Sequence, residues 1–193
     1  MKPTTPVLSK KDYEVRPTPL EVAQHLVSDY HYSKGGSNTR TYVHGLYLKG
    51  TLECLGVAWW IPPTKSCAIN SYPSGDWRKV LSLSRLVILP SVPQNGASFL
   101  MGNSIKLIKE DGRFECLVTY ADTWRGHTGS IYKATNWEYL GLTKPQDVWT
   151  DQTGRMVSRK AGPKTRTKSE MKELGYELVG KFPKHKYRII FAK

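Results

Sequence analysis

The feature that most constrains the fold is a pair of apolar stretches joined by a segment of helical spacing. Residues 80–89 read as a strand, and their second half, Leu-Val-Ile-Leu at 86–89, is continuously apolar, which is typical of a strand covered on both faces. Residues 97–109 carry apolar side chains at helical spacing, and residues 116–120 form a second buried strand. A strand, a helix and a second strand in that order predict parallel strands in an α/β sheet.

The other elements extend this pattern over one domain, which suits a chain of 193 residues. Thr18 and Pro19 predict the start of a helix that ends near Tyr30, because Thr caps helices and Pro suits the first helical position. Residues 1–11 are expected to form a flexible N-terminal tail, and residues 62–79, which contain Pro, Ser and Gly, a long surface loop. Further strands are expected at 12–15, 41–48, 55–61 and 187–191, and a further helix at 128–137.

The charge of the chain favours a polyanionic partner. Its formal net charge is +13, its pI is about 9.7 and 11% of its residues are aromatic, so the surface can bind phosphates and the rings can stack on bases. Residues 155–172 hold seven Lys or Arg against one acid. We interpret this basic insertion or loop, around 150–172, as an arm that grips phosphates through Lys160, Lys164 and Arg166; a solvated loop is the alternative.

Cysteine usage and hydropathy predict a cytoplasmic protein that does not enter a membrane. Cys54, Cys67 and Cys116 show no CxxC spacing, and no secretory signal is visible at the N-terminus. No stretch reaches the roughly 18 apolar residues that a membrane span needs.

Three side chains are candidates for proton chemistry. His31 follows the first helix and precedes a glycine-rich loop, so it is a candidate base, with an ordinary role at the helix end as the alternative. Asp122 follows the second buried strand, where open α/β sheets place their sites; it could be a base, a metal ligand, a partner for Arg85 or a helix cap. Tyr132 lies one turn into its helix, and its hydroxyl could protonate a leaving group or be satisfied in the core.

The turn after the first buried strand is a candidate anion site. Backbone N–H groups and the helix dipole point at a ligand there, and a pyrophosphate such as that of coenzyme A would fit. A single glycine carries the signal, without a Walker or Rossmann pattern. No metal motif is complete, since the five His are scattered and neither HExxH nor CxxC occurs. The turn residues concerned are Gln94, Asn95, Gly96, Ala97 and Ser98.

Three runs of the sequence resemble one protein family: HYSKG at 31–35, SRLVILP at 84–90 and LVTYADTWRGHTGSIYKATNWEYLGLTKP at 117–145. They look like the Mom DNA-modification proteins of Mu-like phages, which are regarded as divergent members of the GNAT acetyltransferase fold. The resemblance implies one GNAT-like catalytic domain over residues 12–193, with a mixed central sheet flanked by helices. It also implies an enzyme that adds a carbamoylmethyl group to adenine N6 and so shields phage DNA from host restriction enzymes.

The resemblance further implies which residues form the site. The donor would be acetyl-CoA or another activated donor, although residues 94–97 are a poor version of the usual GNAT pyrophosphate loop. The resemblance leaves open whether a divalent metal such as iron is required, with His31 and Asp122 as its ligands. By position, the catalytic residues would be His31, Tyr32, Arg85, Asp122 and Tyr132.

Double-stranded DNA would be the partner, and any oligomer would be a homodimer. Because adenine N6 is buried in the duplex, the base must be extruded or met single-stranded. Two alternatives remain: an ordinary GNAT acetyltransferase that acts on a protein or small-molecule amine, and a basic DNA-binding protein without catalysis. The aromatic and basic residues expected near the nucleic acid, besides those of the basic insertion, are Tyr72, Trp77, Trp124 and Arg125.

Overall fold

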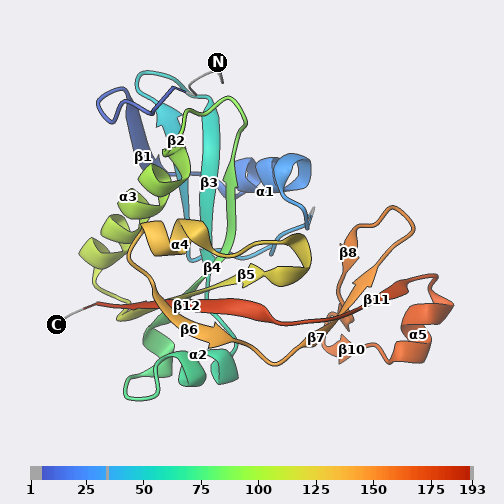
Figure 1. Ribbon diagram of the computed structural model, residues 1–193. Helices are drawn as coiled ribbons and strands as arrows, with labels where there is room; N and C mark the ends of the chain where they lie inside the picture. The colour runs from blue at the N-terminus through green and yellow to red at the C-terminus, as the bar shows by residue number, and fades with distance from the viewer. Residues whose placement is uncertain (1–5, 34, 192–193) are drawn as a thin grey trace.

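The computed structural model describes residues 6–33 and 35–191, and its centre is a seven-stranded mixed sheet (Figure 1). The strands lie in the order β1-β2-β3-β4-β5-β12-β6, and every neighbouring pair is antiparallel except β4 and β5. The predicted parallel pair is therefore confirmed. The strands of this sheet are β1 (Tyr13–Pro17), β2 (Tyr42–Leu48), β3 (Cys54–Ile61), β4 (Val80–Ile88), β5 (Cys116–Asp122), β6 (Glu138–Leu142) and β12 (Lys184–Ile190).

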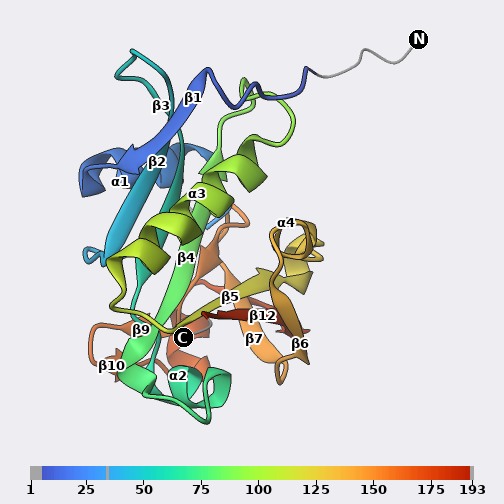
Figure 2. The same ribbon diagram turned by 90° about the vertical axis from the view of Figure 1, so that its left-hand side faces the viewer.

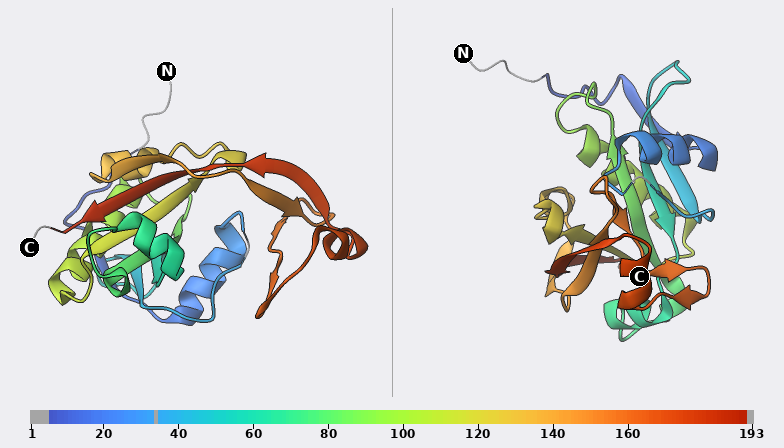
Figure 3. Two further views of the ribbon diagram at one scale, coloured as in Figure 1. Left: turned by 90° about the horizontal axis from the view of Figure 1, so that it is seen from below. Right: turned by 90° about the vertical axis from the view of Figure 1, so that its right-hand side faces the viewer.

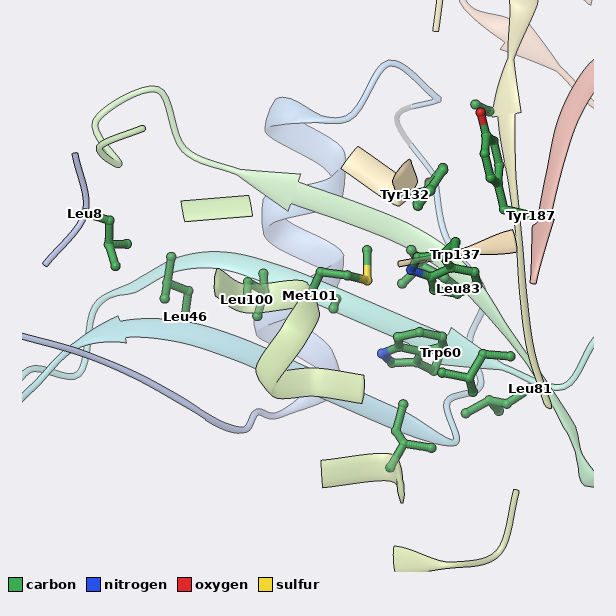
Figure 4. Close-up of a cluster of buried hydrophobic side chains, with 14 residues drawn as sticks. Leu8, Leu46, Trp60, Leu81, Leu83, Leu100, Met101, Tyr132, Trp137 and Tyr187 are labelled. Carbon is green, nitrogen blue, oxygen red and sulfur yellow. The ribbon is translucent and has the colours of Figure 1, made fainter. Parts of the chain in front are cut away.

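Helices cover both faces of the sheet: α3 and α4 pack on one face, α1 and α2 on the other (Figures 1 and 2). Trp59 and Trp60, both fully buried, fall into the clusters of opposite faces, because successive side chains of a strand point opposite ways. Figure 4 shows the cluster that contains Trp60. None of the helices in the described residues could cross a membrane. The helices are α1 (Leu20–Tyr30), α2 (Lys65–Ser71), α3 (Gly96–Asp111), α4 (Ser130–Ala134) and α5 (Lys168–Glu173), with 3-10 turns at Trp77–Lys79 and Thr123–Arg125.

Two local predictions differ from the structure. The stretch expected to be a long loop contains α2, because the Thr64 side chain accepts a hydrogen bond from the Cys67 N–H and caps a new helix. The helix expected at 128–137 ends at Ala134, because Asn136 takes a left-handed conformation with φ of 62°. Both differences arise at single residues whose side chain or backbone competes with the regional pattern.

The N-terminal segment differs from the predicted tail where the structure describes it. Residues 1–5 of that prediction lie outside the described residues. Leu8 donates its N–H to the Gln94 carbonyl at 2.9 Å, and Gln94 donates its N–H to the Pro6 carbonyl at 2.9 Å. The Leu8 side chain is buried. The segment therefore covers the turn between β4 and α3.

The parallel strands β4 and β5 separate after a short contact. They pair from Val80 to Ser82 of β4 and no further. Farther along β4, Trp59 of β3 pairs with Arg85 and Trp60 with Leu83, so Ser84 is an extra residue in the ladder. Such a bulge bends its strand. The bend and the end of pairing together open the sheet at its centre.

An arm of residues 146–182 extends from the sheet beyond α1 (Figure 3). Its small core contains the buried side chains of Trp149 and Met171. The arm also approaches the body, because a Cβ built on Gly35 would lie 3.6 Å from Nη2 of Arg155. The arm consists of a three-stranded sheet, β7 (Gln146–Thr150), β8 (Met156–Val157) and β11 (Glu177–Phe182), a hairpin, β9 (Lys160–Ala161) and β10 (Lys164–Thr165), and α5.

A buried polar cluster joins the sheet to α3. His44 Nδ1 lies 2.7 Å from Ser104 Oγ, and Trp60 Nε1 donates to the same oxygen at 2.8 Å. His44 is 3% exposed, and burial lowers its pKa from 6.5 to about 4. The imidazole is therefore neutral in the folded protein at neutral pH.

Acid should destabilise the fold through His44. Below pH 6.5 the unfolded chain binds a proton that the folded chain binds only near pH 4, so the stabilising contribution is complete above pH 6.5 and is lost as pH falls toward 4. A His44→Gln variant should lack this loss, which is worth up to about 3 kcal/mol for a single group. Urea unfolding from pH 7 to 4 measures it. The exposed His25→Gln serves as control, and equal pH slopes for wild type and His44→Gln would contradict the assignment.

Candidate active site

A cavity of about 560 Å³ lies where β4 and β5 separate. Its walls come from segments far apart in the sequence. The bulged half of β4 forms one wall, and the end of β5 with the glycine-containing loop before α4 forms another. The end of α1 closes the mouth. The lining residues are 30–32, 83–88, 120–121 and 126–132.

Asp122 stands at the end of β5, with both carboxylate oxygens engaged. The Tyr32 hydroxyl donates to Oδ2, and Lys184 Nζ lies 2.8 Å from Oδ1. Lys184 is placed there by the strand register, since it pairs directly with Asp122 across β5 and β12. Burial alone would raise the pKa of Asp122, but the hydrogen bonds from Lys184 and Tyr32 outweigh burial and lower it. Asp122 is thus an ionised anchor for Tyr32 rather than an open proton acceptor.

His31 lies just after α1, with its ring 4.3 Å from that of Tyr32 between centroids. Its Nδ1 is 2.8 Å from Ser33 Oγ, and Ser33 Oγ donates to the Gly35 carbonyl at 3.1 Å. The Ser33 backbone N–H donates to the same Nδ1 at 3.2 Å, so Nδ1 is an acceptor. The proton of the neutral ring is then on Nε2.

The charge state of His31 fits a proton acceptor. Burial, followed by the nearby cation of Arg85 and by His127, lowers the pKa of His31 from 6.5 to about 4. A neutral imidazole at neutral pH can accept a proton. Of the two candidate bases in the sequence, His31 is the neutral one, whereas Asp122 is ionised and both of its oxygens already accept hydrogen bonds.

Arg85 sits on β4 next to the bulge residue Ser84. Its Nε donates to the Gly35 carbonyl at 3.0 Å, and its Nη1 donates to the Ser84 carbonyl at 2.7 Å. These bonds connect Arg85 to the loop that orients His31. The loop is itself close-packed, because a Cβ on Gly36 would lie 2.4 Å from the Trp59 ring.

Tyr132 reaches the cavity from α4 and is 8% exposed. Its ring packs against Trp137 and Tyr187, with centroids 5.6 and 5.2 Å apart. Burial raises the pKa of the Tyr132 hydroxyl, which therefore stays protonated and can donate. The structure thus brings His31, Tyr32, Arg85 and Tyr132 to one cavity, with Asp122 bonded directly behind Tyr32.

The family model described as the Mom protein family matches residues 12–193. The chain belongs to the Mom protein family. The resemblance seen in the three sequence runs is therefore confirmed. A search of proteins of curated function found no match.

Solved acetyltransferase structures share the fold of this Mom-family chain. An N-acetyltransferase from Staphylococcus aureus Mu50 is 12% identical, with a TM-score of 0.54 over 92% of this chain and 98% of the other. The ribosomal-protein-S18-alanine N-acetyltransferase from Escherichia coli is 9% identical, with a TM-score of 0.56 over 94% and 95%. Spermidine N-acetyltransferase from Vibrio cholerae, in complex with CoA and spermine, is 7% identical, with a TM-score of 0.54 over 93% and 96%. The predicted GNAT-like fold is confirmed.

The turn expected to hold a coenzyme A pyrophosphate does not line the cavity. Gln94 gives its N–H to Pro6, and Gly96 gives its N–H to the Pro93 carbonyl at 3.1 Å. Gly96 is buried, and a Cβ there would lie 2.2 Å from Val92 and 3.7 Å from Leu8. A glycine allows close approach of phosphate only where its backbone is open. The N–H groups of Gln94 and Gly96 in this Mom-family chain are therefore not open to a pyrophosphate.

His31 and Asp122 do not form a metal site as arranged. Within residues 6–33 and 35–191, no group of three or more His, Cys, Asp or Glu is placed to hold a metal ion. Both oxygens of Asp122 already accept hydrogen bonds, one of them from the cation of Lys184. Positive charge beside a carboxylate opposes the binding of a divalent cation.

The residues expected at the nucleic acid are scattered. Trp124 and Arg125 lie beside the cavity mouth, with Arg125 stacked 4.0 Å from the centre of the Trp124 ring and 5.5 Å from that of Tyr32. Tyr72 is 9% exposed and donates to Glu115, so its ring face is not free. Trp77 is exposed but lies near the start of β5, the end opposite Asp122, because its neighbour Lys79 pairs with Glu115.

The basic insertion is less free than its composition implies. Lys164 pairs with Glu170, and Lys168 pairs with Asp147 at 3.1 Å. Lys160 is exposed, and Arg166 is half-buried. Exposed Lys–Glu pairs contribute little to stability and are readily exchanged for a phosphate.

Three site residues escaped sequence reasoning. Lys184 lies in a basic C-terminal stretch, yet only strand register sets it opposite Asp122. Ser33 and Gly35 look like ordinary loop residues in the sequence, although their hydrogen bonds connect His31 to Arg85. The glycine-rich loop after His31 was the one available signal, since a loop beside a candidate base is often functional.

Proposed function

We propose that this Mom-family protein is a transferase that adds a carbamoylmethyl group to adenine N6 in double-stranded DNA and thereby protects phage DNA from restriction. One observation carries the proposal: the four lining side chains and Asp122 come from four distant elements and meet at one cavity. Family membership supports the DNA substrate, and the fold supports group transfer.

The geometry supplies roles for the transfer. The base is extruded into the cavity at a cost of a few kcal/mol, offset by contacts there. The neutral imidazole of His31 takes the N6 proton as N6 bonds to the donor carbon. The bond from that carbon to its leaving group breaks, and the leaving group keeps the electron pair and takes a proton from Tyr132. Arg85 stabilises the negative charge that develops.

Transfer to a small polyamine, the reaction named for one structural neighbour, fits the cavity poorly. Among residues 6–33 and 35–191, no acidic residue lines it. A polycation would need carboxylates to replace its hydration.

Nucleoside analysis of DNA from cells that express the protein tests this proposal. The wild type should yield a modified deoxyadenosine whose mass corresponds to carbamoylmethylation. Tyr132→Phe keeps the ring in contact with Trp137 and Tyr187 and removes only the hydroxyl, so the modified fraction should fall about tenfold or more. Unmodified DNA from wild-type cells that contain folded protein would refute the proposal. An unchanged yield from Tyr132→Phe would remove Tyr132 as the acid.

A further inference from the structure

One permanent charge lines the cavity among the residues that the structure describes. Arg85 is the only Lys, Arg, Asp or Glu in this described lining, and the low pKa of His31, about 4, keeps that imidazole neutral. Asp122 and Lys184 lie behind the wall and pair with each other. The lining therefore carries one unbalanced positive charge, which favours a ligand with one negative charge.

Some N–H donors of the Arg85 guanidinium are engaged by the protein and others are not. Nε and Nη1 donate to backbone carbonyls, and Nη1 also lies 3.3 Å from Ser84 Oγ. Across the described part of the chain, no hydrogen bond or ion pair engages Nη2. A partly buried cation without an anionic partner is costly, and the two N–H groups of Nη2 can donate to a carboxylate.

The turn between β4 and α3, where the sequence predicted the pyrophosphate of coenzyme A, is covered by the N-terminal segment. Residues 6–8 cover the turn before α3, and Gly96 is buried beneath Leu8 and Val92. No Lys, Arg or His occurs between Arg85 and Lys106, so the turn has no cation for a pyrophosphate. Its covered backbone and its lack of charge both oppose a diphosphate there.

We propose that the group donor is a small molecule with one carboxylate, held by Arg85 inside the cavity, and not a coenzyme A thioester. The inference rests on the proposed function, because it assigns the second substrate of that same site. A cavity of about 560 Å³ that also receives an adenine leaves room for a small donor only. The phosphates of an extruded nucleotide stay with the backbone at the mouth, so they do not compete for Arg85.

Ligand-induced shifts in Tm and calorimetric titration of the full chain test the assignment. Glycolate and malonamate are each compared with their neutral partners, glycolamide and malonamide. The carboxylates should bind more tightly than the amides to the wild type. Arg85→Gln should weaken carboxylate binding by about tenfold or more and leave the amides unchanged, and Arg85→Lys should fall between. Arg78→Gln, which removes an exposed cation elsewhere, should match the wild type.

Three outcomes would overturn the assignment. One is carboxylates that bind no better than amides. Another is acetyl-CoA that binds the wild type more tightly than the carboxylates, or that alone supports DNA modification by purified protein. A third is Arg85-dependent binding of dAMP or inorganic phosphate without carboxylate binding. A failure of the proposed function alone would give a different result. The carboxylates would still bind, but DNA from expressing cells would stay unmodified.

Discussion

A His31→Gln variant is expected to lose at least about 100-fold of the adenine modification, because general-base catalysis contributes 10² to 10⁴ in rate. The glutamine side chain keeps a polar group near Ser33 but cannot accept a proton at neutral pH. His31 is neutral there, since its pKa is about 4, so its protonated fraction is small throughout the physiological range. The wild-type rate should therefore not decline through protonation of His31 until the pH approaches 4.

Initial rates of modified deoxyadenosine formation, measured by mass analysis of digested DNA, give the size of the loss. His25→Gln is the matched control, because His25 lies on α1, the helix that His31 follows, but is exposed and away from the cavity lining. It should keep the wild-type rate. If His31→Gln modifies DNA as fast as His25→Gln, His31 is not the base, and the argument from its neutral imidazole fails.

An Asp122→Asn variant should lose a comparable part of the activity for another reason. Asp122 orients Tyr32 and balances Lys184, so the neutral amide leaves Lys184 without a counter-charge beside the site. The free energy of unfolding should fall by about 1–3 kcal/mol, the cost of leaving a buried polar group poorly satisfied. The lowered pKa of Asp122 means that this stability is present above its ordinary value of 3.8 and is lost as pH falls below it.

Urea unfolding at pH 7 and pH 3, with nucleoside analysis of plasmid DNA, measures both effects. Asp76→Asn is the control, since Asp76 also pairs with a cation, Arg78, but lies outside the cavity lining. The stability difference between wild type and Asp122→Asn should shrink from pH 7 to pH 3. A stable Asp122→Asn protein with the wild-type yield of modified adenine would show that the Tyr32 anchor is dispensable.

The order of elements could be predicted because it depends on local periodicity. The apolar run of β4, the helical spacing of α3 and the apolar β5 are each visible within about ten residues. The parallel pairing of β4 and β5 follows from the rule for strand–helix–strand units, and the structure agrees. For the arm, the sequence predicted only its basic character. Its strands β8, β9 and β10 have two residues each, which is too short for a periodic signal.

The sequence predicted some residues of the candidate site correctly and misplaced others. His31, Arg85, Asp122 and Tyr132 were named from strand ends, loops and family resemblance, and the fold brings them to one place. The turn of residues 94–98 shows the opposite case. Its local pattern resembles an anion site, but the chain's own N-terminal segment accepts the Gln94 N–H and lies against Gly96. Local sequence cannot reveal that competition, because the two segments are distant in the chain.

By itself, the sequence determined the fold class, the family and the basic character of the surface, since periodicity, motif and net charge are properties of the chain alone. Only the tertiary structure decided which groups are free to act. Strand register sets Lys184 against Asp122, the β4 bulge turns Arg85 into the cavity, and residues 6–8 close the turn before α3. Charge state and access depend on neighbours through space, and those neighbours exist only once the sheet has formed.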